Sequence, residues 1–183
     1  YVFGSKNKTI LKNTKIYNVQ EFDNNLYNLT GALNFYSSKI NIDNLELYNV
    51  NAEDCINFVK SSFNISNSKI YSCKSDGIDS DFSNGKVSDT LFKNIGGDAF
   101  DTSGSYSNLE NINFNHIGDK GLSIGEISNV SINEININDS KIGIASKDES
   151  IIKGTNVMIT NSLIADLAAY QKKSFFGKSS VKI

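Results

Sequence analysis

The sequence contains no Arg, no Pro and no Trp, and the absence of Arg removes a whole class of interaction. Without Arg, the chain cannot make the bidentate guanidinium contacts that often bind carboxylates and phosphates, so Lys supplies every fixed positive charge. The formal net charge is only -2, which gives no electrostatic reason to expect binding to nucleic acid or to an anionic membrane. No apolar run approaches the ~20 residues of a membrane span, so we expect no membrane insertion.

Cysteine is also scarce, since Cys55 and Cys73 are the two in the chain. Two cysteines are too few for a disulfide scaffold or for a Cys-based zinc site, and we expect both to be unpaired, small apolar residues. The opening residues, YVFGSKNKTI, lack the apolar core of a signal peptide. Because the chain starts at Tyr1, we expect a mature form or a segment of a larger protein. The length of 183 residues predicts a single domain over residues 1–183.

A repeat with a period of about 22 residues runs through the chain. The stretches IYNV, LYNV, IYSC, FKNI, FNHI, INDS and ITNS align with one another. Their third positions form a polar column: Asn18, Asn49, Ser72, Asn94, His116, Asp139 and Asn161. An apolar column follows at nearly constant spacing: Leu33, Ile56, Ile78, Phe100, Leu122 and Ile144.

Apolar and polar residues alternate over short segments of each repeat, which indicates strands. The stretch SLIADLAAY (Ser162 to Tyr170) is the one place with a helical periodicity. Strand repeats of this length stack as parallel coils about 4.8 Å apart. We therefore expect an all-β fold, a single-stranded right-handed parallel β-helix (a solenoid) of about seven coils of about 22 residues.

The polar column predicts an Asn ladder, in which stacked side-chain amides bond to one another and to the backbone of a turn. His116 occupies a position in this column. We therefore interpret the one His of the chain as a member of the ladder and not as a catalyst.

The chain resembles the right-handed parallel β-helices of the pectate-lyase-like superfamily from about residue 10 to residue 183. Four central stretches, KSDGID, GGDAFD, DKGLSIGE and GIASKD, are similar in order and spacing to the motifs of polygalacturonases, a family of glycoside hydrolases. This resemblance puts Asp76, Asp98 and Lys147 at positions that carry function in that family. The chain departs from the family at three other positions, where Gly97 replaces the general acid, Lys120 the His and Ala145 the Arg. The resemblance implies carbohydrate chemistry without fixing the reaction.

Acidic residues gather in the central repeats, beginning with Asp54, Asp76 and Asp98 in one column. Since Ile78 should point inward, strand alternation turns Asp79 outward, and Asp101 likewise follows Phe100. Carboxylates stacked on neighbouring coils repel, and one of each pair should have a raised pKa unless a cation intervenes. The candidate catalytic residues are Asp76, Asp79, Asp98, Asp101, Lys120 and Lys147. The candidate substrate-binding residues are Asp81, Ser103, Ser123 and Glu126.

Three interpretations of these acids remain open. A pair of carboxylates could act as acid and base in glycan cleavage. A Ca²⁺ ion could instead be bound by Asp79, Asp81 and Asp101, because hard cations take oxygen ligands. The acids could also be solvated surface residues, whose repulsion salt screens. A lyase or epimerase would have to use Lys120 or Lys147 with a lowered pKa, since Arg is absent.

We expect a secreted or cell-surface domain that binds a polysaccharide and cleaves it, as a glycoside hydrolase or a polysaccharide lyase or epimerase. The alternative is a non-catalytic structural or adhesive segment of a larger cell-surface or phage tail protein. At the C-terminal end, Phe175 and Phe176 are expected to cap the core of the last coil. The N-terminal end has no evident cap, which predicts further domains or end-to-end association.

Overall fold

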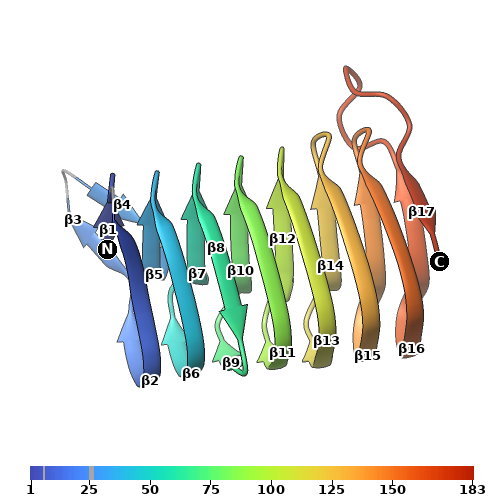
Figure 1. The fold of residues 1–183 in the computed structure, drawn as a ribbon. Helices are drawn as coiled ribbons and strands as arrows, with labels where there is room; N and C mark the ends of the chain where they lie inside the picture. The colour runs from blue at the N-terminus through green and yellow to red at the C-terminus, as the bar shows by residue number, and fades with distance from the viewer. Residues whose placement is uncertain (6, 25–26) are drawn as a thin grey trace.

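The computed structural model describes residues 1–5, 7–24 and 27–183, and it is a parallel β-solenoid of about six turns (Figure 1). The all-β prediction is confirmed, because the described residues form strands and turns without a helix. The described part of the chain therefore also lacks a helix that could cross a membrane.

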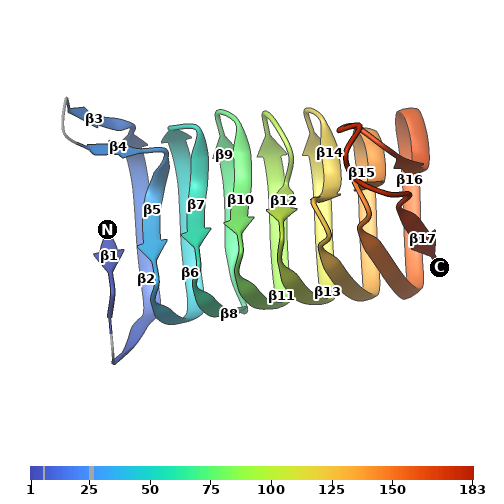
Figure 2. The ribbon, with the colours of Figure 1, turned by 90° about the horizontal axis from the view of Figure 1, so that it is seen from above.

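The described residues form seventeen strands, and nearly all of them pair in parallel within one continuous sheet. Figure 2 shows the successive coils stacked side by side from the N-terminus to the C-terminus. The exception is β3, which pairs with β4 in antiparallel fashion. The strands are β1 (Val2–Phe3), β2 (Lys8–Gln20), β3 (Phe22–Asn24), β4 (Tyr27–Leu29), β5 (Gly31–Tyr36), β6 (Lys39–Asn51), β7 (Asp54–Val59), β8 (Ser62–Ser66), β9 (Lys69–Cys73), β10 (Asp76–Asp81), β11 (Asn84–Ile95), β12 (Phe100–Ser103), β13 (Tyr106–Ile117), β14 (Lys120–Gly125), β15 (Asn129–Lys147), β16 (Ile151–Tyr170) and β17 (Ser180–Lys182).

The stretch SLIADLAAY, which has a helical periodicity in the sequence, lies inside β16 as a strand. Its backbone pairs with β15, from Ser162 opposite Ser140 to Tyr170 opposite Lys147. The hydrogen bonds to the preceding coil therefore outweigh a weak local preference for helix.

The apolar column predicted from the repeat forms the interior of the solenoid. Adjacent coils place its members directly opposite one another, from Leu33 against Ile56 to Leu122 against Ile144. From Ile56 onward each of these side chains is fully buried. A single coil cannot enclose such residues alone, so stacking between coils supplies the core.

The polar column occupies a corner of the solenoid at which every member has a left-handed backbone, with φ between 54° at Asn49 and 64° at Asp139. Asn, Asp and His tolerate this conformation better than most residues, which explains the composition of the column. Along the column, the side-chain amide of Asn49 donates to Asn18 (3.3 Å) and His116 contacts Asp139 (2.6 Å). His116 thus lies at the same corner as the other members of the column.

A second ladder, which the sequence analysis missed, is made of buried serines. In each step the backbone N–H of one Ser donates to the hydroxyl oxygen of the Ser one coil further on, at 2.9 to 3.1 Å. These hydroxyls satisfy backbone groups at a corner that is shut off from water. The column was visible in the sequence through its spacing: Ser38, Ser61, Ser83, Ser105, Ser128 and Ser150.

The prediction that the cysteines are unpaired is wrong, because Cys55 and Cys73 form a disulfide with their Cα atoms 5.9 Å apart. Cys55 lies on β7 and Cys73 on β9, and both side chains point into the solenoid, where they are buried. The inward side chains of neighbouring faces meet in the interior. Two cysteines on different faces can therefore form a disulfide although the chain contains no others.

We expect the Cys55→Ala/Cys73→Ala double variant to be less stable than the wild-type protein by about 3 kcal/mol, because the bond closes a short loop in the unfolded chain. Urea denaturation of both proteins measures this difference. A reducing agent should destabilise the wild-type protein and leave the double variant unchanged. Equal midpoints for the two oxidised proteins would show that the disulfide contributes nothing.

Candidate functional site

The candidate site lies on the outward face of β10, β12 and β14, three neighbouring strands of the solenoid. Asp79 pairs in register with Asp101, and Asp101 with Ser123. These side chains point away from the core because Ile78 and Phe100, their neighbours in the chain, are fully buried. The predicted outward orientation of the two aspartates is therefore consistent with the alternation along each strand.

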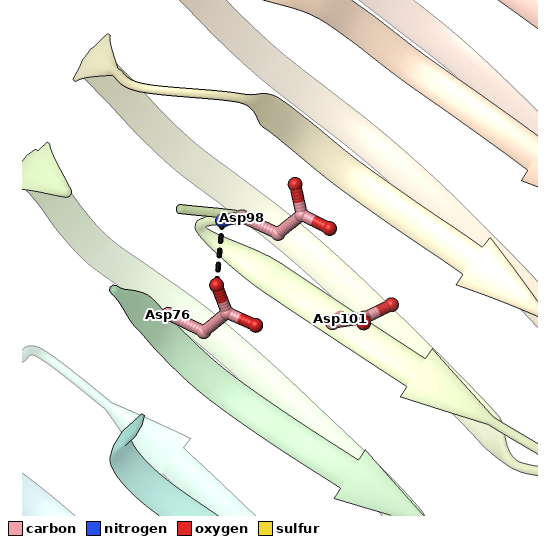
Figure 3. A group of neighbouring side chains, drawn as sticks. All are labelled: Asp76, Asp98 and Asp101. Atoms are coloured by element: carbon pink, nitrogen blue, oxygen red, sulfur yellow. Dashed lines mark hydrogen bonds between the residues drawn. The ribbon is translucent and has the colours of Figure 1, made fainter. Parts of the chain in front are cut away.

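Three carboxylates converge at the start of these strands (Figure 3). One carboxylate oxygen from each of Asp76, Asp98 and Asp101 lies within 4.8 Å of the others. Among the described residues, this is the group with the spacing to share a cation. It contains only Asp101 of the predicted Ca²⁺ set, since Asp79 and Asp81 lie outside it.

Asp76 and Asp98 also have a structural role, which explains their spacing in the sequence. Asp76 Oδ1 accepts a hydrogen bond from the backbone N–H of Asp98 (2.8 Å), and Asp98 Oδ1 accepts one from the backbone N–H of Lys120 (3.0 Å). Each aspartate thus satisfies the backbone of the next coil at the same turn. A Cβ atom at Gly97 would lie 2.0 Å from Asp76 Oδ1, so any other side chain at position 97 would require Asp76 to move away from the backbone of Asp98.

The two predicted lysines are paired with these acids. Lys120 Nζ lies 2.6 Å from Asp119 Oδ2 and 3.3 Å from Asp98 Oδ1. Lys147 is 8% exposed, and its Nζ donates to the Ser123 hydroxyl (2.8 Å) and lies 3.8 Å from Asp101 Oδ1. Both lysines therefore act as counter-charges within the face.

The lowered pKa that a lyase would need at Lys120 is contradicted. Burial lowers the pKa of Lys120, but the hydrogen bonds and charges of Asp119 and Asp98 outweigh burial and raise it above the ordinary value. Lys120 consequently stays protonated at neutral pH and cannot serve as a general base.

Burial raises the pKa values of several carboxyls on this face, including Asp81 and Asp101, although Lys147 partly offsets the shift of Asp101. Burial, reinforced by the charges of Asp81, Asp54 and Asp101, raises the pKa of Asp79 to about 8. Burial raises the pKa of Asp54 to about 7 and that of Asp76 to about 6, and neighbouring aspartates add to both shifts. Asp79 therefore carries a proton at neutral pH. Asp54 was not among the predicted site residues, although it begins the same sequence column as Asp76.

The predicted substrate-binding residues lie where the three strands end. Asp81 pairs in register with Ser103, and Glu126 follows the end of β14 directly. Asp81, Ser103 and Glu126 line a groove of about 720 Å³, whereas Ser123 lies buried beneath Lys147. The structure thus brings three of the four residues together at one edge of the outward face.

The prediction that Phe175 and Phe176 cap the core is wrong, because both line this groove and Phe175 is 77% exposed. They belong to the segment between β16 and β17, which projects at the edge where β10, β12 and β14 end (Figure 1). Asp148 Oδ1 accepts hydrogen bonds from the backbone N–H groups of Lys172 and Lys173, at 2.7 Å each. These bonds hold the segment against the side of the solenoid instead of across its end.

Comparisons with known proteins identify no family. No protein-family model matches the chain, and no curated protein matches it. One solved structure that matches is a variant of the catalytic domain of a GH87 α-1,3-glucanase in complex with tetrasaccharides, with 13% sequence identity and a TM-score of 0.31. The alignment covers 96% of this chain and 55% of that one, so the chain spans about half the length of the matched structure.

Proposed function

We propose that the outward face of β10, β12 and β14 binds a polysaccharide and hydrolyses it. The observation that supports this proposal is the pairing in register of Asp79, which is protonated at neutral pH, with Asp101, which faces Lys147. Neighbouring coils lie about 4.8 Å apart, so the two carboxyls can flank a single glycosidic bond. The parallel β-solenoid supports the proposal as a scaffold, and hydrolysis is the reaction for which the proposed groups suffice.

In this proposal the two carboxyls have different roles. Asp79 donates its proton to the glycosidic oxygen as the bond breaks, because only a protonated carboxyl can act as a general acid. Asp101 supplies the negative charge that activates water or stabilises the developing positive charge on the sugar. Burial raises the pKa of Asp101, and Lys147 opposes this shift, since an opposite charge favours ionisation. Asp76 and Asp98 hold the backbone of the turns that carry this pair.

Elimination is the less suitable reaction for this face. A lyase or epimerase removes a proton from a sugar that carries a carboxylate, and it needs a base and a cation to bind that carboxylate. Lys120 is bound to Asp98 and Asp119, and its pKa is raised. Lys147 is occupied by Ser123 and Asp101. Hydrolysis requires only the carboxyl pair.

We also propose that the protein works outside the reducing cytosol, as a secreted or cell-surface domain. The Cys55–Cys73 disulfide supports this localisation, because such bonds persist in oxidising compartments.

The proposal is tested by incubating the purified chain with a panel of neutral, amino-sugar and uronate polysaccharides. We expect new reducing ends from at least one member and no unsaturated products. Asp101→Asn should abolish the release, whereas Asp166→Asn, an exposed aspartate on β16, should not change it. Unsaturated products would show that the reaction is an elimination and not a hydrolysis. Binding without any cleavage would favour the alternative of a non-catalytic adhesive segment.

A further inference from the structure

The groove at the edge of the candidate site has aromatic side chains that the proposed chemistry leaves unused. Phe82 and Tyr106 are each 63% exposed and Phe175 is 77% exposed, and all three line the groove. Large aromatic rings are normally buried or covered, so three exposed rings around one groove indicate a surface for a ligand. The groove is about 720 Å³, which is large enough for a sugar ring with its neighbours.

Phe82 is held at the groove by a backbone conformation that is unfavourable for a bulky residue. Phe82 has a left-handed backbone with φ of 50°, which a bulky residue rarely adopts. The corresponding corner of the next coil is Gly104, where an added Cβ would lie 2.7 Å from Phe82 Cδ1. Gly104 therefore leaves the space that the Phe82 ring occupies, and the ring lies across the edge of the groove.

The groove and the adjoining face contain more carboxyls than lysines. The three lysines are each already paired with an acid, Lys120 with Asp98, Lys147 with Asp101 and Lys173 with Glu126. Asp54, Asp76, Asp79 and Asp81 form no salt bridge within the described residues. Asp81 stands between the two regions, since it lines the groove and lies two residues along β10 from Asp79.

A buried polar atom beside Asp79 also lacks a partner. Asn57 is 5% exposed and pairs in register with Asp79, so its side chain shares the outward face. Its Nδ2 donates to the Thr30 hydroxyl, and its Oδ1 has no hydrogen-bond partner among the described residues. Because the two atoms diverge from one carbon, Oδ1 points away from Thr30. This acceptor is shut off from solvent and does not line the groove, where the unpaired carboxyl is that of Asp81.

We propose that this face and groove bind a polysaccharide whose sugars carry free amino groups, with one sugar ring against Phe82 and its ammonium group toward Asp81. This inference rests on the proposed function and names its substrate class. The groove offers the carboxyl oxygens of Asp81, which form no salt bridge with the described residues, and oxygen acceptors of this kind are what the N–H donors of an ammonium group need. Aromatic faces attract cations in addition to the apolar side of a sugar ring.

The same arrangement disfavours a uronate chain. A substrate carboxylate would enter a face in which Lys120, Lys147 and Lys173 are already paired, and it would meet the carboxyls of Asp81, Asp101 and Glu126. Like charges at such distances cost free energy, and these three lysines are already engaged by acids of the protein. The substrate class therefore differs from the polygalacturonate that the motif resemblance implies.

Calorimetry with three oligosaccharides of equal length tests the inference: glucosamine oligomers, their N-acetylated counterparts and galacturonate oligomers. We expect the glucosamine oligomer to bind about tenfold more tightly than the N-acetylated one, which is the value of one charge-assisted hydrogen bond. The galacturonate oligomer should bind most weakly. Equal or tighter binding of either control oligomer would overturn the proposal, and so would the absence of binding by all three.

Two variants locate the binding. Asp81→Asn should weaken binding of the glucosamine oligomer about tenfold, and Phe82→Ala roughly three- to tenfold. Phe22→Ala, which removes an exposed aromatic ring from β3, should leave the affinity unchanged. Wild-type affinity in both Asp81→Asn and Phe82→Ala would show that the groove is not used.

The outcome separates this inference from the proposed function. Cleavage of a neutral glycan that is lost in Asp101→Asn but unaffected in Asp81→Asn and Phe82→Ala would keep the hydrolase and refute the amino-sugar groove. Binding of glucosamine oligomers that depends on Asp81 and Phe82, without cleavage, would keep the groove and refute the hydrolase.

Discussion

Asp79→Asn is expected to lower the turnover of the polysaccharide that the protein cleaves by about 10²–10⁴, which is the usual contribution of a general acid. Asp79 pairs in register with Asp101, and burial among other aspartates raises its pKa to about 8. The amide of Asn has nearly the same shape but cannot transfer a proton to a leaving group. Steady-state rates of reducing-end formation by the two proteins measure the loss.

Two comparisons make this prediction specific. Asp166→Asn changes an exposed aspartate on β16 and should retain full turnover. The wild-type rate should also fall as the pH rises through about 8, because Asp79 then loses the proton that it donates. Full turnover in Asp79→Asn would assign the acid to another residue.

Leu122→Ala is expected to destabilise the fold by about 2–5 kcal/mol, through lost apolar burial and the cavity that remains. Leu122 is fully buried and pairs in register with Phe100 on one side and Ile144 on the other. Its removal therefore interrupts the stacked column in the middle of the solenoid. Urea denaturation measures the effect.

Leu163→Ala is the matched control, because Leu163 lies on β16 and is 79% exposed. It should change the free energy of unfolding by less than about 0.5 kcal/mol. If Leu122→Ala were equally mild, the column at Leu122 would not be a packed core.

The stacked architecture could be predicted from the sequence because each coil repeats the same order of apolar and polar positions. An apolar residue 22 positions from the last one meets it in register, as Ile78 meets Phe100, so periodicity and three-dimensional contact coincide. The corners can be located in the sequence for the same reason, because a left-handed backbone favours Asn and Asp at a fixed position of the repeat.

Contacts between faces of the solenoid could not be predicted in this way. The Cys55–Cys73 disulfide joins strands on different faces, and no repeat relates the two positions. Phe175 depends on where Asp148 anchors the segment after β16, which is a contact over more than twenty residues. A short sequence pattern therefore cannot predict that Cys55 lies beside Cys73, or where the segment that carries Phe175 lies.

The candidate site was partly predictable. Alternation along β10 and β12 turned Asp79 and Asp101 outward, and the repeat put them on adjacent coils. Their different roles depend on which acid has a nearby lysine, since Lys147 lies beside Asp101 and the described lysines form no salt bridge with Asp79. The contact between Lys147 and Asp101 depends on how far the lysine side chain extends across two coils, which the spacing of residues in the sequence does not determine.

The central claim is that Asp79 on the outward face stays protonated at neutral pH because its ionised form destabilises the fold. Melting temperatures of the wild-type protein and of Asp79→Asn between about pH 5 and about pH 8 test this claim. A carboxyl with a raised pKa binds its proton more tightly in the folded state, so stability falls as the pH rises from the ordinary Asp value of about 4 through the folded value. For Asp79 that folded value is about 8. We predict that the wild-type melting temperature falls across this range, that the fall is smaller in Asp79→Asn, and that the variant is more stable by about 1–3 kcal/mol at the upper end. Parallel curves for the two proteins would contradict this and show that Asp79 titrates as an ordinary surface residue.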